Sequence, residues 1–152
     1  MKRQQVLAKL EAAWAAFNDS YTGLSDDQML QPGVMEHWSV RDLIAHVAWW
    51  EEESLQHLPQ ILQGIRPPRY SVVYGGIDAF NARMTELKQK LTLAEVRRQA
   101  LDTHQRLVVY LNGVPEEPFA SDTRFRRRLR LDTYSHYPIH AAAIRAWREQ
   151  QT

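Results

Sequence analysis

Two histidines one helical turn apart, His136 and His140, form the pattern in this sequence that points most directly to chemistry. They lie in the stretch DTYSHYPIHAAAIRAW, residues 132–147, with Pro138 between them. Residues four apart share one face of a helix, and such a pair commonly supplies two imidazole ligands to one metal ion. The alternative is a pair of polar residues that hydrogen-bond to nearby hydroxyl or carbonyl groups. The spacing alone leaves both interpretations open.

The segment around this pair is predicted to face the inside of a helical bundle. One face of it gathers Leu129, Thr133, His136, Tyr137, His140, Ile144 and Trp147. Because the apolar spacing extends back to Leu129, we expect one continuous helix from about Leu129 to Gln150, which Pro138 would kink. A helix that begins near Ser135 would instead place the proline harmlessly in its first turn. Buried imidazoles need partners for their ring nitrogens, and a metal ion would satisfy one nitrogen of each ring.

Two further histidines compete to be the third ligand. His104 lies at the centre of the inward face of its helix, so periodicity favours it. His46 lies at the edge of an apolar stripe and is nearly aligned with Asp42, Trp50 and Glu53. The remaining candidates, His37 and His57, are expected to be solvated.

The elements that would position these residues are all predicted to be helices. A first helix carries Leu7, Leu10, Trp14, Phe17 and Tyr21 on one face, a second runs to about Leu62, and a third region, Asp78–Leu111, divides near Thr92. Three starts show a capping box, in which a hydroxyl residue precedes an acidic or amide residue by three positions: Ser25 and Gln28, Ser39 and Asp42, Thr92 and Glu95. The prediction is a single all-α domain, residues 1–152, built as a four-helix bundle with long interhelical loops at Gly64–Gly76 and Gly113–Arg124.

Composition narrows the class of protein. The chain has 152 residues, a formal net charge of +1 and no cysteine, which excludes disulfides and thiolate metal sites. The near-neutral charge makes nucleic acid an unexpected partner. Since there is no signal-peptide pattern and no apolar run of membrane-spanning length, we expect a cytoplasmic protein without a membrane partner.

Three motifs together resemble a known family. HWSVRDLIAHVAWWEEE, DAFNARM and DTYSHYPIHAAAIRAW occur in this order. They are similar to the DinB-like superfamily and, more narrowly, to its four-helix-bundle branch, the ClbS/DfsB family. The similarity extends from about Met1 to Trp147.

The resemblance implies a metal site and a class of function. In DinB-like proteins a histidine of the second helix joins two of the last around a divalent ion, commonly zinc or nickel; here these are His46, His136 and His140. His104 then becomes a core or supporting histidine. The family includes thiol-dependent transferases and resistance proteins that hydrolyse a reactive cyclopropane, so the resemblance implies a metal-dependent hydrolase or transferase acting on a small electrophile. A non-enzymatic binding or sequestering module and a stress-response interaction protein are the alternatives.

Other residues are candidates for supporting roles. Glu53 is a candidate general base, and Asp42 could support a ligand; solvation of Glu53 and helix capping by Asp42 are the structural alternatives. The run RFRRRLR, Arg124–Arg130, is either a solvated helix start or an anion site in which Arg126 and Arg130 bind substrate. Trp50 and Tyr137 are candidate pocket residues, although packing is the alternative for the tryptophans. The aromatic residues are compatible with a homodimer, but bundles of this size also exist as monomers.

Overall fold

Helices make up the regular structure of the computed structural model, which describes residues 2–151. Met1 and Thr152, the two ends of the predicted domain, lie outside the described residues. Within the described range no strand forms, and Met35 and Trp38 make only an isolated bridge. The predicted all-α fold is confirmed. None of the described helices combines the length and the apolar character needed to cross a membrane.

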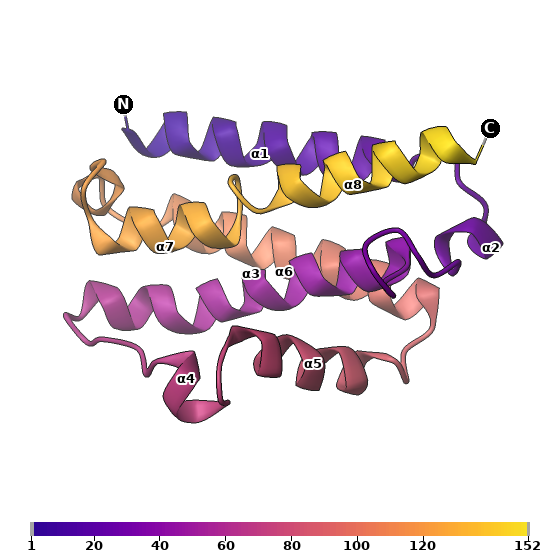
Figure 1. Cartoon of the computed structure of the whole chain (residues 1–152). Helices are drawn as coiled ribbons and strands as arrows, with labels where there is room; N and C mark the ends of the chain where they lie inside the picture. Colours follow the sequence, from indigo (N-terminus) through magenta and orange to yellow (C-terminus); the bar gives the residue numbers. More distant parts are fainter. Residues whose placement is uncertain (1, 152) are drawn as a thin grey trace.

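Four helical rods lie side by side and form the bundle (Figure 1). They are α1 (Lys2–Tyr21), α3 (Val40–Leu62), α6 (Leu93–Asn112), and a fourth rod composed of α7 (Arg124–Asp132) and α8 (Tyr137–Gln150). The connections contain three short helical turns: α2 (Asp26–Met29), α4 (Tyr70–Val73) and the 3-10 turn η1 (Glu117–Phe119).

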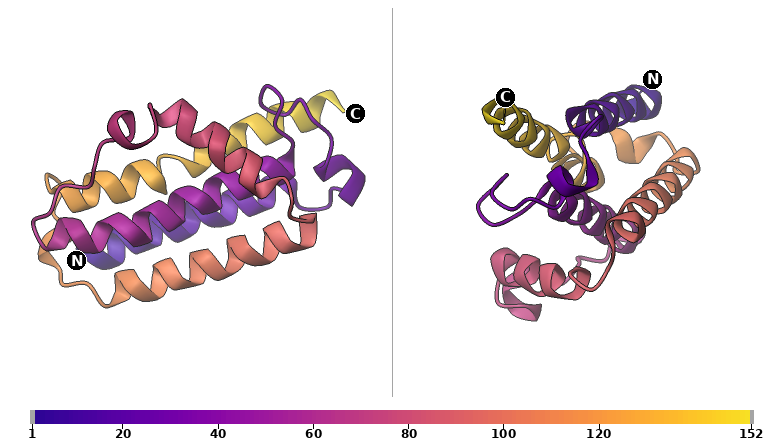
Figure 2. Two further views of the ribbon diagram at one scale, coloured as in Figure 1. Left: turned by 90° about the horizontal axis from the view of Figure 1, so that it is seen from below. Right: turned by 90° about the vertical axis from the view of Figure 1, so that its right-hand side faces the viewer.

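The remaining helix, α5 (Ile77–Lys88), is not part of the bundle. It packs against α3, and the end-on view in Figure 2 shows it beside the four rods. The predicted division of the Asp78–Leu111 region is therefore confirmed, because Thr92 caps α6 after α5 has ended.

The three predicted capping boxes are present. The Ser39 hydroxyl accepts a hydrogen bond from the Asp42 backbone N–H at 3.1 Å, and the Asp42 carboxylate accepts one from the Ser39 N–H at 3.0 Å. Ser25 with Gln28 and Thr92 with Glu95 form the same reciprocal pair. Each box satisfies two backbone donors that would otherwise lack partners at a helix start.

The prediction of one continuous last helix is wrong, because the helix is interrupted between Asp132, where α7 ends, and Tyr137, where α8 begins. Pro138 has no N–H, and its ring would clash with the carbonyl four residues earlier, so a helix cannot run smoothly through it. Instead Pro138 lies in the first turn of α8, and the Thr133 hydroxyl donates to the Leu129 carbonyl at 2.5 Å as α7 ends. The break lets the fourth rod pack on α3 through α7 and on α1 through α8.

The core lies between the four rods. Its largest fully buried side chains come from every rod: Leu10 and Phe17 of α1, Leu43, Ile44 and Leu58 of α3, Leu107 and Leu111 of α6, and Phe125, Leu129, Tyr137 and Ile144 of α7 and α8. This core fixes the positions of α3 and of the start of α8, where the histidines predicted to bind metal lie.

Candidate metal centre

His46, His136 and His140 meet at one point between α3 and the start of α8. Nε2 of His46 lies 2.9 Å from Nε2 of His136, and Nε2 of His140 lies 2.9 Å from the same atom. One ligand atom from each of the three residues lies within 4.8 Å of the others. No other group of three metal-binding side chains is found among residues 2–151.

The local structure explains how these three rings converge. His46 lies in the second turn of α3, and its ring packs against Trp38 and against the edge-on ring of Trp49, with ring centroids 4.6 and 5.0 Å away. His136 is the residue that caps α8, and His140 lies one turn into that helix. The interruption between α7 and α8 therefore determines how the His136 ring is oriented toward His46 and His140.

All three imidazoles are neutral at pH 7. Burial lowers the pKa of His46 to about 2, helped by the neighbouring His136 and His140. Burial likewise lowers the pKa of His136 to about 4 and that of His140 to about 3. Neutral imidazole is the form that binds a metal ion, because the ligand nitrogen must offer a lone pair.

The three residues fit a divalent ion. A ring nitrogen carries either one proton or one lone pair, so Nε2 of His136 can form only one well-aligned hydrogen bond, although two other Nε2 atoms lie 2.9 Å from it. An ion bound by all three lone pairs removes this conflict. Two nitrogens each about 2.0–2.1 Å from one ion lie roughly 3 Å apart, which matches the observed spacing.

The histidines line a cleft with a volume of about 1090 Å³. Its aromatic walls are Trp38, Trp50 and Tyr70, and one face of α5 closes the opposite side with Asp78, Asn81, Thr85 and Glu86. Asp42, Asp132 and Arg128 also line it. A small molecule could therefore contact the triad and α5 at the same time.

The DinB superfamily model matches residues 9–147 of this sequence. The chain belongs to the DinB superfamily. Two solved structures share the DinB fold with it: DfsB, described as a sibling lethal factor precursor, with 16% identity, and the colibactin self-resistance protein ClbS in complex with double-stranded DNA, with 12% identity. Both have a TM-score of 0.81; the alignments cover 98% of this chain and 96% of DfsB, and 97% of this chain and 95% of ClbS. A search of curated proteins found no match.

His104 does not join the triad of this DinB-superfamily chain. Its Nδ1 lies 2.7 Å from a carboxylate oxygen of the fully buried Glu51, its Nε2 contacts Glu11, and its ring stacks on Trp14 with centroids 4.0 Å apart. Periodicity favoured His104 because it identifies a buried position, and His104 is indeed buried, but in a different part of the bundle.

Tyr137 belongs to the same buried network rather than to the cleft. The tyrosine is fully buried, and its hydroxyl donates to Glu51 at 2.5 Å. The predicted pocket role of Tyr137 is therefore not supported, whereas Trp50 does line the cleft. Glu51 thus connects α3 to α6 through His104 and to α8 through Tyr137.

Glu53 lies outside the cleft lining. Burial alone would raise the pKa of Glu53, but hydrogen bonds from His57 and Tyr70 outweigh it and hold the pKa below its ordinary value. The Tyr70 hydroxyl donates to Glu53 at 2.7 Å, and His57, predicted to be solvated, is buried beside the same carboxylate. This placement does not support a general base at Glu53. His37, by contrast, is exposed as predicted.

The arginine that lines the cleft is Arg128, whereas Arg126 and Arg130 do not line it. Arg126 donates to the Phe119 carbonyl, and Arg130 is exposed. Arg128 donates to Asp132 at 2.6 Å and to the Tyr70 hydroxyl at 2.7 Å, so its charge is already paired. Asp42 lines the cleft while it caps α3, so its predicted capping role is present.

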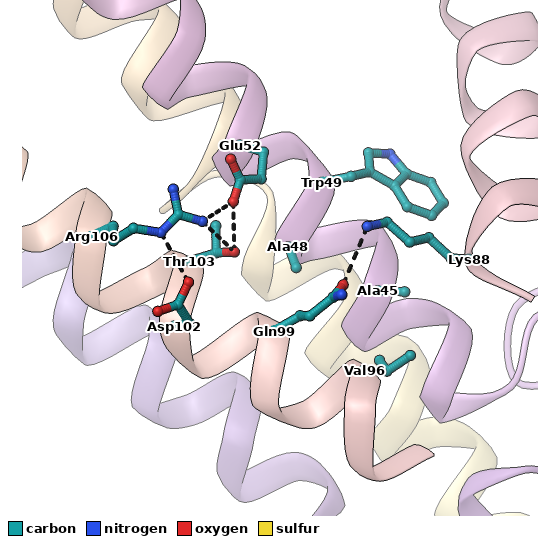
Figure 3. Close-up of a pocket in the computed structure, with 10 residues that line it drawn as sticks. All are labelled: Ala45, Ala48, Trp49, Glu52, Lys88, Val96, Gln99, Asp102, Thr103 and Arg106. Carbon is teal, nitrogen blue, oxygen red and sulfur yellow. Dashed lines mark hydrogen bonds and ion pairs between the residues drawn. The ribbon is translucent and has the colours of Figure 1, made fainter. Parts of the chain in front are cut away.

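A second, smaller hollow of about 290 Å³ lies over α3 and α6 and contains no histidine (Figure 3). Its polar side chains pair with one another: Arg106 with Glu52 and Asp102, and Lys88 with Gln99. With its charges compensated internally, this hollow does not compete with the cleft as a site.

Proposed function

We propose that this protein is a metal-dependent enzyme, a hydrolase or a transferase, that acts on a small electrophilic compound. The observation that supports the proposal is the convergence of three neutral imidazole nitrogens at the wall of a cleft large enough for a small molecule. Three protein ligands are typical of catalytic metal sites, since a fourth position stays open for water or substrate. Zinc and nickel are the ions that we expect there.

The ion would supply Lewis acidity, which activates a bound water or thiol or polarises a polar group of the substrate. His46, His136 and His140 would hold it in place. The rings of Trp38 and Trp49 pack against the His46 ring and hold it in its orientation. Tyr70 and Trp50 provide an aromatic wall against which a compact substrate can pack.

The name of one structural neighbour supports a protective function. ClbS is named as a self-resistance protein against colibactin, and DfsB is described with reference to a lethal factor. The name of ClbS connects this fold with protection from a harmful compound. We propose a comparable protective role for this chain.

Metal content measured on tag-free protein tests the proposal. We expect about one zinc or nickel ion per chain, lost in His136→Ala and retained in His37→Ala, a matched control because His37 lines the cleft but is absent from the triad. The metal-loaded protein would then be assayed with an epoxide, an activated cyclopropane and a chloronitrobenzene, each with and without an added thiol. Full activity in metal-free protein would refute the proposal.

A non-enzymatic binding or sequestering module is the second candidate. One observation favours it, because both aspartates of the cleft lining already accept hydrogen bonds from protein groups. Asp42 accepts from Ser39 and Arg41. Asp132 accepts from Ser54 and Arg128. Neither carboxylate is a free general base. This candidate predicts ligand binding without turnover and an affinity that does not change when the metal is chelated.

A further inference from the structure

Asn81 of α5 is held in one orientation by two tryptophans of α3. Its side-chain oxygen Oδ1 accepts hydrogen bonds from the indole nitrogens of Trp49 at 3.1 Å and Trp50 at 2.9 Å. An indole N–H can only donate, so the oxygen of the amide must face the two rings. A flipped amide would leave two buried indole N–H groups opposite another donor, at a cost of about 1–3 kcal/mol each.

The other end of this amide is free. Oδ1 is fixed on the indoles, and Nδ2 has no hydrogen-bond partner among the described residues. Nδ2 is also accessible, because it is absent from the buried side-chain atoms that lack a partner. Asn81 lines the cleft, in the middle of the α5 face opposite the triad. Its two N–H donors are therefore available to a molecule in the cleft.

The charges around Asn81 restrict which acceptor can bind there. Five carboxylate residues line the cleft: Glu36, Asp42, Asp78, Glu86 and Asp132. Asp42 is paired with Arg41 and Asp132 with Arg128, so Glu36, Asp78 and Glu86 are the carboxylates of the lining without an ion pair among the described residues. Arg128 is the one arginine or lysine in the lining, and it is already paired with Asp132 and Tyr70. These three unpaired carboxylates outnumber the two positive charges of a divalent ion at the triad, so the cleft stays negative and disfavours an anionic carboxylate or phosphate beside Asn81, whereas a neutral oxygen acceptor or a cation is accepted.

We propose that Asn81 is a substrate-binding residue whose side-chain N–H donates to a carbonyl-type oxygen of a neutral or cationic substrate. This inference rests on the proposed function, because it takes the cleft to be the substrate site. It narrows the substrate class from electrophiles in general to those that bear an amide, ketone or ester oxygen and lack an anionic group. Because the two indoles fix the amide before binding, little conformational freedom is lost when the hydrogen bond forms.

Asn81→Asp is the matched variant. An aspartate keeps an oxygen that accepts from Trp49 and Trp50, but it replaces the free donor by a second acceptor. Titration of benzamide and benzylamine, two probes of similar size, into metal-loaded ¹⁵N-labelled protein separates these roles. The two indole N–H signals report whether the contact between α3 and α5 survives the substitution.

We expect benzamide to shift the side-chain amide signals of Asn81, and we expect its affinity to fall about tenfold in Asn81→Asp, since a donor is lost and an acceptor opposes the carbonyl. The affinity of benzylamine for Asn81→Asp should equal or exceed its affinity for the unchanged protein. Equal benzamide affinity in the two proteins, or no shift of the Asn81 amide signals at millimolar benzamide, would overturn the inference. The shift is measured on the unchanged protein, so this test does not depend on the variant's folding.

Metal content distinguishes this failure from failure of the proposed function. Asn81→Asp should contain as much metal as the unchanged protein, because Asn81 does not touch the triad ligands. A protein that binds metal and turns over an electrophile without any Asn81 response would refute the role of Asn81 alone. A protein that shows the Asn81 response but needs no metal would refute the metal-dependent enzyme alone.

Discussion

Glu51 provides the sharpest test of what holds the four rods together. Its side chain is fully buried, and one carboxylate oxygen accepts from both His104 Nδ1 at 2.7 Å and the Tyr137 hydroxyl at 2.5 Å. The other oxygen is buried and has no hydrogen-bond partner. Glu51→Gln keeps the shape and the doubly bonded oxygen, but it removes the charge and places an unpaired amide N–H₂ at the second position.

The expected loss follows from these contacts. Two charge-assisted hydrogen bonds become neutral ones, which costs about 1 kcal/mol each, and an unpaired buried donor costs a further 1–3 kcal/mol or so. Relief from burying a carboxylate offsets part of this sum. We therefore expect Glu51→Gln to lower the free energy of unfolding by about 3 kcal/mol near pH 6.

The pH dependence of this cost reflects Glu51 and His104 together, because burial also raises the pKa of Glu51 above its ordinary value. Burial alone would lower the pKa of His104, but the carboxylates of Glu51 and Glu11 outweigh it and raise the pKa above its ordinary value of 6.5. A raised histidine pKa adds stability that is fully present below pH 6.5 and is lost as the pH rises through the raised value. The cost of Glu51→Gln should therefore shrink at alkaline pH, where His104 is neutral even beside Glu51.

Urea denaturation of metal-free protein from pH 5.5 to 9.5 measures the free energy of unfolding that Glu51→Gln loses and the dependence of this loss on pH. Glu52→Gln is the control, because Glu52 is the next residue of α3 and its half-exposed carboxylate pairs with Arg106 at the surface (Figure 3). Such surface pairs contribute about 0–1 kcal/mol, so the control should lose little. A Glu51→Gln cost that equals the control, or that does not change with pH, would show that this network does not stabilise the bundle as argued.

Three further predictions concern acid stability, helix capping and nucleic acid. In metal-free protein the unfolded chain takes up protons at His46, His136 and His140 below about pH 6.5, while the folded pKa values lie at about 2, 4 and 3. The free energy of unfolding should thus fall as the pH drops from 7 to 5, with a slope of up to about 1.4 kcal/mol per pH unit for each histidine, and His136→Ala should flatten that slope. Ser39→Ala should cost about 1 kcal/mol by thermal denaturation, because it removes the cap of α3, and Ser39→Thr should cost much less. Unlike ClbS, which was solved in complex with double-stranded DNA, this chain has a formal net charge of only +1 and should not retard a DNA duplex at physiological salt; a retarded complex would contradict this prediction.

Local chemistry explains which parts of the fold could be predicted. The starts of α2, α3 and α6 are encoded in four adjacent residues each, so the capping boxes at Ser25, Ser39 and Thr92 were visible in the sequence. The continuous last helix was predicted wrongly because apolar residues keep helical spacing on both sides of the break. They do so because α7 and α8 each pack inward, although against different neighbours.

The candidate site was harder to predict from the sequence, because its contacts join residues that are far apart in the chain. His46 could be proposed as a partner of His136 only through the family resemblance, since 90 residues separate them in the sequence. Periodicity measures burial and therefore selected His104, whose partners are carboxylates. The contacts of Asn81 with Trp49 and Trp50 span 32 and 31 positions, so DAFNARM contained the residue but gave no sign of its orientation.

The position of α5 outside the bundle affects where the sequence of this protein can vary during evolution. The three histidines lie on α3 and at the start of α8, which the common core fixes. The opposite wall of the cleft belongs to α5, which packs mainly on α3. Substitutions at the α5 positions that line the cleft alter what the cleft admits without changing the core that positions the three histidines. Under the proposed function, homologues that act on different substrates should therefore differ most in sequence along α5.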